Sequence, residues 1–135
     1  MEKCLNKSYK LVRFDEFYDD YLEAIGLNIF NRKIAKSIPS TTQFIKLDDC
    51  AYAINTIIPF KTHQQKFVLG QENDAFTIDG RKIKNLFVID GNKLIEQQIE
   101  PVRKVTITRE FTDDEILGEI VVGDVICKYW CSAVQ

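Results

Sequence analysis

The chain contains 135 residues, of which 45% are hydrophobic and 28% are charged, with a net charge of −2 at pH 7 and a pI near 5.4. These values predict one globular domain spanning residues 1–135, and they argue against nucleic-acid binding, which normally needs a basic patch and a high pI. We find no secretory signal region and no run of about 18 apolar residues, so we expect a cytoplasmic protein, with the nucleus as a further compartment.

The four cysteines, Cys4, Cys50, Cys127 and Cys131, form no Cys-x-x-Cys pair, and His63 is the only histidine. A zinc site of the finger type is therefore not expected, and we assign the chain no metal and no cofactor.

The first predicted elements are a strand over residues 8–14 and a helical pair over about 17–38, the only long helical stretch in the chain. The first helix has one apolar stripe with helical spacing, formed by Tyr18, Tyr21, Leu22 and Ile25. Gly26 is expected to end this helix and Asn28 to begin the second, which Pro39 stops.

The second helix also has two faces. Its apolar stripe consists of Phe30, Ile34, Ala35 and Ile38, and we expect it to turn inward. Its basic residues, Arg32, Lys33 and Lys36, are expected to face away from the protein.

From residue 41 onward the pattern changes to alternation with period two, and turn signals recur about every ten residues. Asp-Gly, a strong hairpin signal, occurs at 79–80 and again at 90–91. The sequence therefore predicts an all-β fold of about ten antiparallel strands, closed as a sandwich or a barrel.

Alternation also predicts which residues face the interior. They are Ile83, Asn85, Phe87 and Ile89 on one strand, Val105, Ile107, Arg109 and Phe111 on another, Ile116, Gly118 and Ile120 on the next, and Cys127, Tyr129 and Cys131 on the last. Trp130 is expected to face outward.

Arg109 is the unusual member of this set, because a buried arginine is costly unless its charge is paired. Its planar guanidinium suits a carboxylate, which could belong to a ligand or to Glu96, on a strand where Leu94, Glu96 and Gln98 share one face. A register slip that puts Arg109 on the surface is a third alternative. The hydroxyl of Tyr129 could donate to the same carboxylate.

No set of residues suggests catalysis, so we expect a protein that is not an enzyme. His63 has no obvious nucleophile or metal partner in the sequence. Cys127 and Cys131 lie about 13 Å apart on a strand and cannot form a disulfide with each other.

Five stretches resemble the intracellular lipid-binding family, the fatty-acid-binding proteins and their retinoid-binding relatives in the calycin superfamily. They are SYKLVRFDEFYDDYLEAIGLNIFNRKIAK at the start, FVLGQENDAFTIDGRKIK in the middle, and IDGNKL, VTITRE and VGDVIC in order after them. The resemblance covers essentially the whole chain. It implies a ten-stranded up-and-down, lipocalin-like barrel capped by a helix-turn-helix, with one or two lipids inside and a portal beside the second helix.

The resemblance carries residue roles with it. Arg32 and Lys33 match the family's Arg-Lys in helix II, Ala35 and Phe60 its portal positions, Asp79 and Arg81 its D-x-R, and Arg109 the inner arginine that helps hold a ligand carboxylate. The full set expected to bind ligand is Tyr18, Tyr21, Leu22, Ile25, Ala35, Phe60, Ile78, Asp79, Arg81, Glu96, Gln98, Ile107, Arg109, Ile120, Tyr129 and Cys131.

The last strand departs from the family pattern. Its usual R-x-Y aligns with Tyr129 and Cys131, and a shift of one residue would place Lys128 and Trp130 there instead. The usual three-residue anchor for a carboxylate is therefore incomplete.

We expect a monomeric carrier of a long-chain fatty acid, with the carboxylate near Arg109 and Tyr129 and the ligand entering under the helical cap. A neutral or bulkier lipid such as a retinoid, with Arg109 neutralised by Glu96, is one alternative. Another is a lipid-transfer module that contacts anionic membranes transiently through the basic face of the cap.

Overall fold

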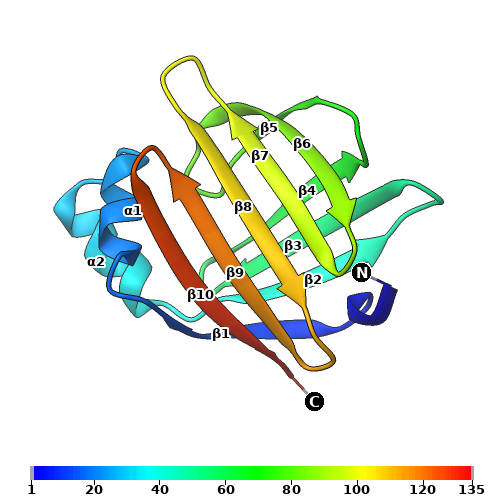
Figure 1. Cartoon of the computed structure of the whole chain (residues 1–135). Coiled ribbons are helices and arrows are strands. Elements are labelled where there is room, and N and C mark those ends of the chain that lie inside the picture. The colour runs from blue at the N-terminus through cyan, green and yellow to red at the C-terminus, as the bar shows by residue number, and fades with distance from the viewer. Residues whose placement is uncertain (1, 135) are drawn as a thin grey trace.

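The computed structural model describes residues 2–134 and confirms the predicted class, a ten-stranded antiparallel barrel with two helices after the first strand (Figure 1). The strands are β1 (Ser8–Phe14), β2 (Thr41–Lys46), β3 (Ala51–Ile58), β4 (Lys61–Val68), β5 (Asn73–Phe76), β6 (Lys82–Asp90), β7 (Lys93–Ile99), β8 (Lys104–Phe111), β9 (Glu115–Val122) and β10 (Val125–Ala133). The helices are α1 (Tyr18–Ala24) and α2 (Ile29–Ser37), and a short 3-10 helix, η1 (Glu2–Cys4), precedes β1.

The strands follow the order β4-β3-β2-β1-β10-β9-β8-β7-β6-β5. Each hydrogen-bonded pair is antiparallel, and β1 pairs with β10, so the two ends of the chain meet within the sheet. β4 and β5 are the two edge strands of this order, and each pairs with a neighbour on one side only. The barrel is therefore nearly closed, with no strand pairing between β4 and β5. Because each step in the order reverses direction, β4 and β6 run the same way.

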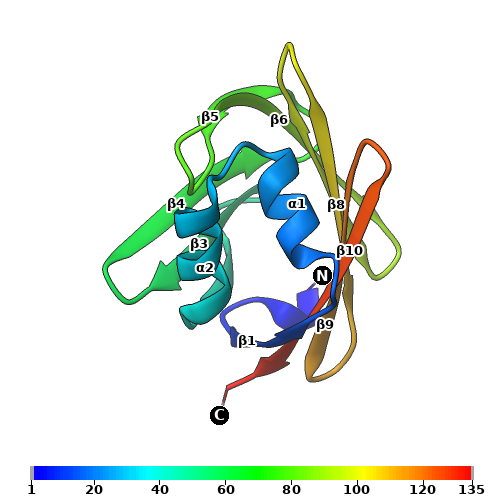
Figure 2. The same cartoon turned by 90° about the vertical axis from the view of Figure 1, so that its left-hand side faces the viewer.

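The two helices lie side by side across one end of the barrel, and η1 lies at the other end (Figures 1 and 2). Gly26 has a φ of +99°, a left-handed conformation that glycine adopts readily, and its backbone N–H bonds to the carbonyl of Glu23 as α1 ends. The Asn28 side chain then accepts a hydrogen bond of 2.8 Å from the backbone N–H of Asn31, as expected of an N-cap. Within residues 2–134, no helix is long and apolar enough to cross a membrane.

The buried side chains form two groups. The larger group fills the barrel away from the helices, and its rings include Phe67 stacked on Phe87 with centroids 3.8 Å apart. The second group joins Leu22 of α1 and its C-cap residue Ile25 to residues of β8, β9 and β10. The cap is therefore fixed mainly through α1.

Alternation predicted the inward residues of the long strands well. Ile83, Asn85 and Phe87 are buried, as are Ile116, Gly118 and Ile120. Ile89 is an exception at 39% exposure, because it stands near the end of β6, at the rim of the barrel. Trp130 faces outward as predicted, where the guanidinium of Arg13 lies 3.6 Å from its ring centroid.

The prediction for α2 was partly wrong. Phe30, expected to turn inward, is 68% exposed, and α2 contains no buried residue at all. The helix lies over the mouth of the barrel and not against a sheet, so only the side bearing Asn31, Ile34 and Ala35 meets the interior.

Candidate functional site

An apolar compartment of about 320 Å³ lies between the cap and the barrel wall. Eight of the residues that the sequence predicted as ligand-binding line it: Tyr18, Tyr21, Leu22, Ile25, Ala35, Phe60, Ile78 and Asp79. Helical spacing places the first four on the inner face of α1, and the others come from α2 and from two turns near the cap. The volume lies within the range of about 300–1,000 Å³ that is usual for small-molecule sites.

A smaller, polar compartment of about 130 Å³ continues from the first one. The two share four lining residues, Tyr21, Thr56, Ile78 and Asp79, so they form one path from the cap into the barrel. The polar compartment adds five more predicted residues, Arg81, Glu96, Gln98, Ile107 and Arg109.

Arg109 points inward from β8, and its Nη1 donates to Oε1 of Glu96 at 2.8 Å. The two side chains are only 13% and 1% exposed. Burial acts to lower the pKa of Arg109, but Tyr129 and Glu96 outweigh it and raise that pKa above its usual value. The guanidinium is therefore charged, and its partner is the internal acid that the sequence had left as an alternative to a ligand.

Tyr129 contacts Arg109 from β10. Burial raises the pKa of its hydroxyl, and the nearby guanidinium opposes this only in part, so the hydroxyl remains a hydrogen-bond donor. The ring lies directly over Gly118 of β9, where a Cβ atom would collide with it. A glycine at this position lets Tyr129 extend toward Arg109.

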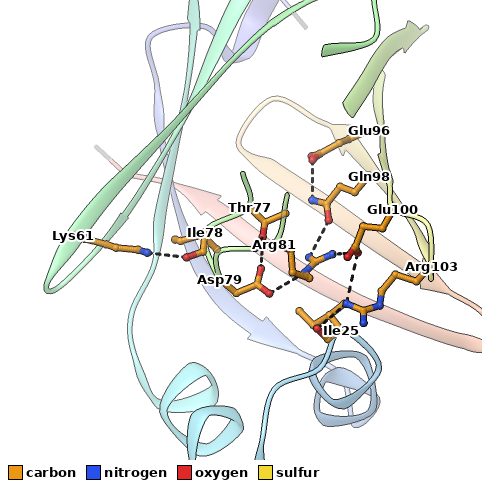
Figure 3. Close-up of polar contacts among 10 residues, drawn as sticks. All are labelled: Ile25, Lys61, Thr77, Ile78, Asp79, Arg81, Glu96, Gln98, Glu100 and Arg103. Atoms are coloured by element: carbon orange, nitrogen blue, oxygen red, sulfur yellow. Dashed lines mark hydrogen bonds and ion pairs between the residues drawn. The ribbon is translucent and has the colours of Figure 1, made fainter. Parts of the chain in front are cut away.

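A chain of polar contacts leads from Glu96 towards the cap (Figure 3). Gln98 donates to Oε2 of Glu96 at 2.9 Å and accepts from Nη2 of Arg81 at 3.1 Å. Arg81 in turn pairs with Asp79 at 2.8 Å and with Glu100 at 2.7 Å. The D-x-R residues thus act as an internal ion pair that ties the turn before β6 to the end of β7.

Arg103 completes this chain. Its Nη1 lies 3.6 Å from Glu100 and donates to the carbonyl of Ile25, at the end of α1, at 2.9 Å (Figure 3). The turn between β7 and β8 therefore holds the C-terminal end of the cap helix. No sequence pattern pointed to Glu100 or Arg103, because both lie in an irregular turn without periodicity.

Three predicted residues lie outside both compartments in the described part of the chain. Cys131 is buried among the larger core group, Ile120 packs with Leu22 and Ile25 under the cap, and Tyr129 reaches the polar compartment only through Arg109.

The polar compartment also contains residues that were not predicted. His63 and Gln65 lie two apart on β4, on the face that also carries buried Phe67, and Thr56 and Thr77 lie beside them. The alternation of β4 could have revealed them, since both share the parity of Phe67. Within residues 2–134, no group of three or more His, Cys, Asp and Glu side chains is placed to hold a metal ion.

The basic face predicted for α2 is not made of free charges. Arg32 is folded back onto Asp19 at 3.2 Å and onto the carbonyl of Leu27 at 2.9 Å, while Lys36 pairs with Asp19 at 2.8 Å. The hydrogen bond from Lys36 and the nearby positive charges lower the pKa of Asp19. Of the three basic residues, only Lys33 has no ion pair within the described chain.

The model of the Lipocalin / cytosolic fatty-acid binding protein family matches residues 7–129. The chain belongs to this family. Its relatives include "Fatty acid-binding protein, liver" of Lethenteron camtschaticum, 34% identical over 110 residues that cover 82% of this chain and 96% of that protein. "Sodium/calcium exchanger regulatory protein 1" of Doryteuthis pealeii is 38% identical over 117 residues, which cover 87% of both chains.

Solved structures of family members agree with the fold. The fatty-acid-binding protein from the brain of Drosophila melanogaster matches with a TM-score of 0.88 and 35% identity, covering 96% of this chain and 99% of the other. A Schistosoma mansoni fatty-acid-binding protein in complex with arachidonic acid matches with a TM-score of 0.92 and 26% identity, covering 100% and 98%. The family is one of binding proteins. In this member, Glu96 forms an ion pair with Arg109, the arginine that faces the interior.

Proposed function

We propose that this protein carries long-chain fatty acids, one molecule at a time, in the cavity under its cap. The observation that carries the proposal is the arrangement of the two compartments: an apolar space of about 320 Å³ leads to a polar one with Arg109 in its wall. A fatty acid has the same division into an apolar tail and a polar end. The relatives of this protein that are named as fatty-acid-binding proteins support the same class of ligand.

The tail would occupy the apolar compartment, where each buried CH2 contributes about 0.8 kcal/mol. The carboxylate would meet Arg109, which uses Nη1 for Glu96 and has further N–H donors to offer. The hydroxyl of Tyr129 would donate to the same carboxylate. In this arrangement the ligand shares its anchor with Glu96.

The lipid would enter between α2 and the turn that joins β3 to β4. Ala35 and Phe60 line the apolar compartment from these two sides, and Phe60 is 68% exposed. The side chain of Phe60 can move aside without disturbing the buried core, because it belongs to neither buried group, whereas Ala35 packs against the second group.

Arg109→Gln tests the position of the carboxylate. We expect the variant to bind a long-chain fatty acid at least about tenfold more weakly, because a hydrogen bond to a charged group contributes about 1.5–3 kcal/mol, while the methyl ester should bind as before. Arg13→Gln on the outer surface is the matched control and should leave both affinities unchanged. Unchanged binding of the acid by Arg109→Gln would show that the head group lies elsewhere.

A neutral lipid such as a retinoid is the second candidate, and the Arg109–Glu96 ion pair favours it. With Glu96 already paired to the guanidinium, an uncharged head group would need no displacement of the internal acid. Titration of the unmodified protein with an acid and with its methyl ester separates the candidates. Tighter binding of the acid supports the fatty-acid carrier, and equal or tighter binding of the ester supports the neutral-lipid carrier.

A further inference from the structure

The wall of the polar compartment formed by β4 differs from the rest, because its polar groups are neutral and unpaired. The Nε2 atoms of His63 and Gln65 are buried, and neither has a hydrogen-bond partner within residues 2–134. The charged groups of the compartment are all paired instead, Arg109 with Glu96 and Arg81 with Asp79. The free hydrogen-bonding capacity of the site therefore lies on β4.

The two side chains on β4 offer opposite halves of a hydrogen-bonding pattern. Burial and the neighbouring Lys61 lower the pKa of His63, so its imidazole is neutral at about pH 7 and keeps one ring nitrogen that can accept a hydrogen bond. The Nε2 of Gln65 is an amide donor. A hydroxyl group both donates and accepts, so one hydroxyl could satisfy both atoms, whereas a methylene group could satisfy neither.

Another buried amide without a partner lies on β6, the strand that pairs with the edge strand β5. Asn85 on β6 is fully buried, and neither atom of its amide has a partner in the described chain. β4 and β6 run in the same direction and are joined by the stacked rings of Phe67 and Phe87. Gln65 and Asn85 each precede one of these rings by two residues, so they lie at the same level of the barrel. Asn85 lines neither compartment, so the subsite is assigned to His63 and Gln65 alone.

We propose that His63 and Gln65 form a subsite for a hydroxyl group on the lipid, so that the preferred ligand is a fatty acid hydroxylated near its carboxylate. The position follows from size, since one compartment of about 130 Å³ is lined by Arg109 as well as by the two β4 residues. A hydroxyl group at the far end of the chain would lie in the apolar compartment instead. This inference rests on the proposed function as a fatty-acid carrier.

Calorimetric titration with hexadecanoic acid and its 3-hydroxy and 16-hydroxy derivatives tests the subsite without any mutation. We expect the 3-hydroxy acid to bind about tenfold more tightly than the unsubstituted acid, since it satisfies buried groups that are otherwise unpaired. The 16-hydroxy acid should show no gain. An equal or weaker affinity for the 3-hydroxy acid would overturn the subsite, and so would an equal gain for both isomers. Failure of all three acids to bind would instead overturn the proposed carrier function.

Two variants assign the gain to these residues. Gln65→Leu and His63→Phe should each lose the preference for the 3-hydroxy acid, measured in each variant as the ratio of its affinities for the 3-hydroxy and the unsubstituted acid. Gln64→Leu is the matched control, because Gln64 lies on the outer face of β4 and bonds to Asn55 there at 2.8 Å. This control should keep the preference. A preference retained by both inner variants would overturn the assignment.

Discussion

Glu96 sets the electrostatic character of the site, and its isosteric replacement by glutamine gives the sharpest perturbation. Glu96 is 1% exposed and bonds to Arg109 at 2.8 Å, so a ligand carboxylate on the same guanidinium would lie about 5 Å from its charge. At that separation and an effective dielectric constant of about 20, the repulsion is about 3 kcal/mol. Rearrangement and residual water reduce this, and we expect Glu96→Gln to tighten fatty-acid binding by about 1–2 kcal/mol, or about 5- to 30-fold.

The same change should destabilise the ligand-free protein, because it leaves the charge of Arg109 buried without a counter-ion. The loss should approach about 3 kcal/mol and be recovered when a fatty acid binds. Isothermal calorimetry measures the affinity, and thermal unfolding with and without ligand measures the recovery. The methyl ester should bind equally to both proteins, and Glu110→Gln, the next residue on the strand beyond Arg109, serves as a control. An unchanged or weaker affinity for the acid would refute the placement of the carboxylate beside Glu96.

Three further predictions concern the parts that hold the site. Arg103→Ala removes the hydrogen bond to the carbonyl of Ile25, and it should lower the free energy of unfolding by about 1 kcal/mol. It should also accelerate fatty-acid dissociation, measured by stopped-flow fluorescence. An unchanged dissociation rate would contradict a role for this contact in holding the cap. Gly118→Ala should cost about 1–3 kcal/mol in urea unfolding, because its Cβ would collide with the ring of Tyr129, and full stability would argue against that packing. The lowered pKa of His63 means that the folded protein binds a proton less readily than the unfolded chain, so the residue contributes stability above about pH 6.5 that is lost as the pH falls. The free energy of unfolding of His63→Phe should therefore fall less between about pH 7 and 5 than that of the unmodified protein. An identical dependence of this free energy on pH would contradict the pKa shift.

The strands were predictable because one rule, alternation, decides both their pairing and their buried face. That rule predicts an inward-facing Arg109, and the structure confirms the placement. Alternation could not choose the partner of Arg109, because Glu96 and a ligand carboxylate offer a guanidinium the same chemical group. The choice depends on how β7 and β8 align, where Glu96 lies opposite Ile107 and one diagonal step from Arg109.

The cap was less predictable, because helical spacing shows which residues share a face but not what covers that face. The stripe of α1 is buried against the barrel, while Phe30 in the stripe of α2 lies in solvent. The ion pairs of Arg32 and Lys36 with Asp19 join two different helices, and the hydrogen bond from Arg103 joins an irregular turn to α1. Such contacts depend on the packing angle of the elements, which no local pattern encodes.

Native mass spectrometry of the protein as purified, without added lipid, tests the central proposal most directly. We expect a folded monomer that retains one molecule with the mass of a long-chain fatty acid, and release of that molecule when the protein is unfolded. After delipidation, the same species should return when a fatty acid is added. A protein that retains a neutral lipid instead, or that stays unloaded in the presence of fatty acids, would contradict the proposed carrier function.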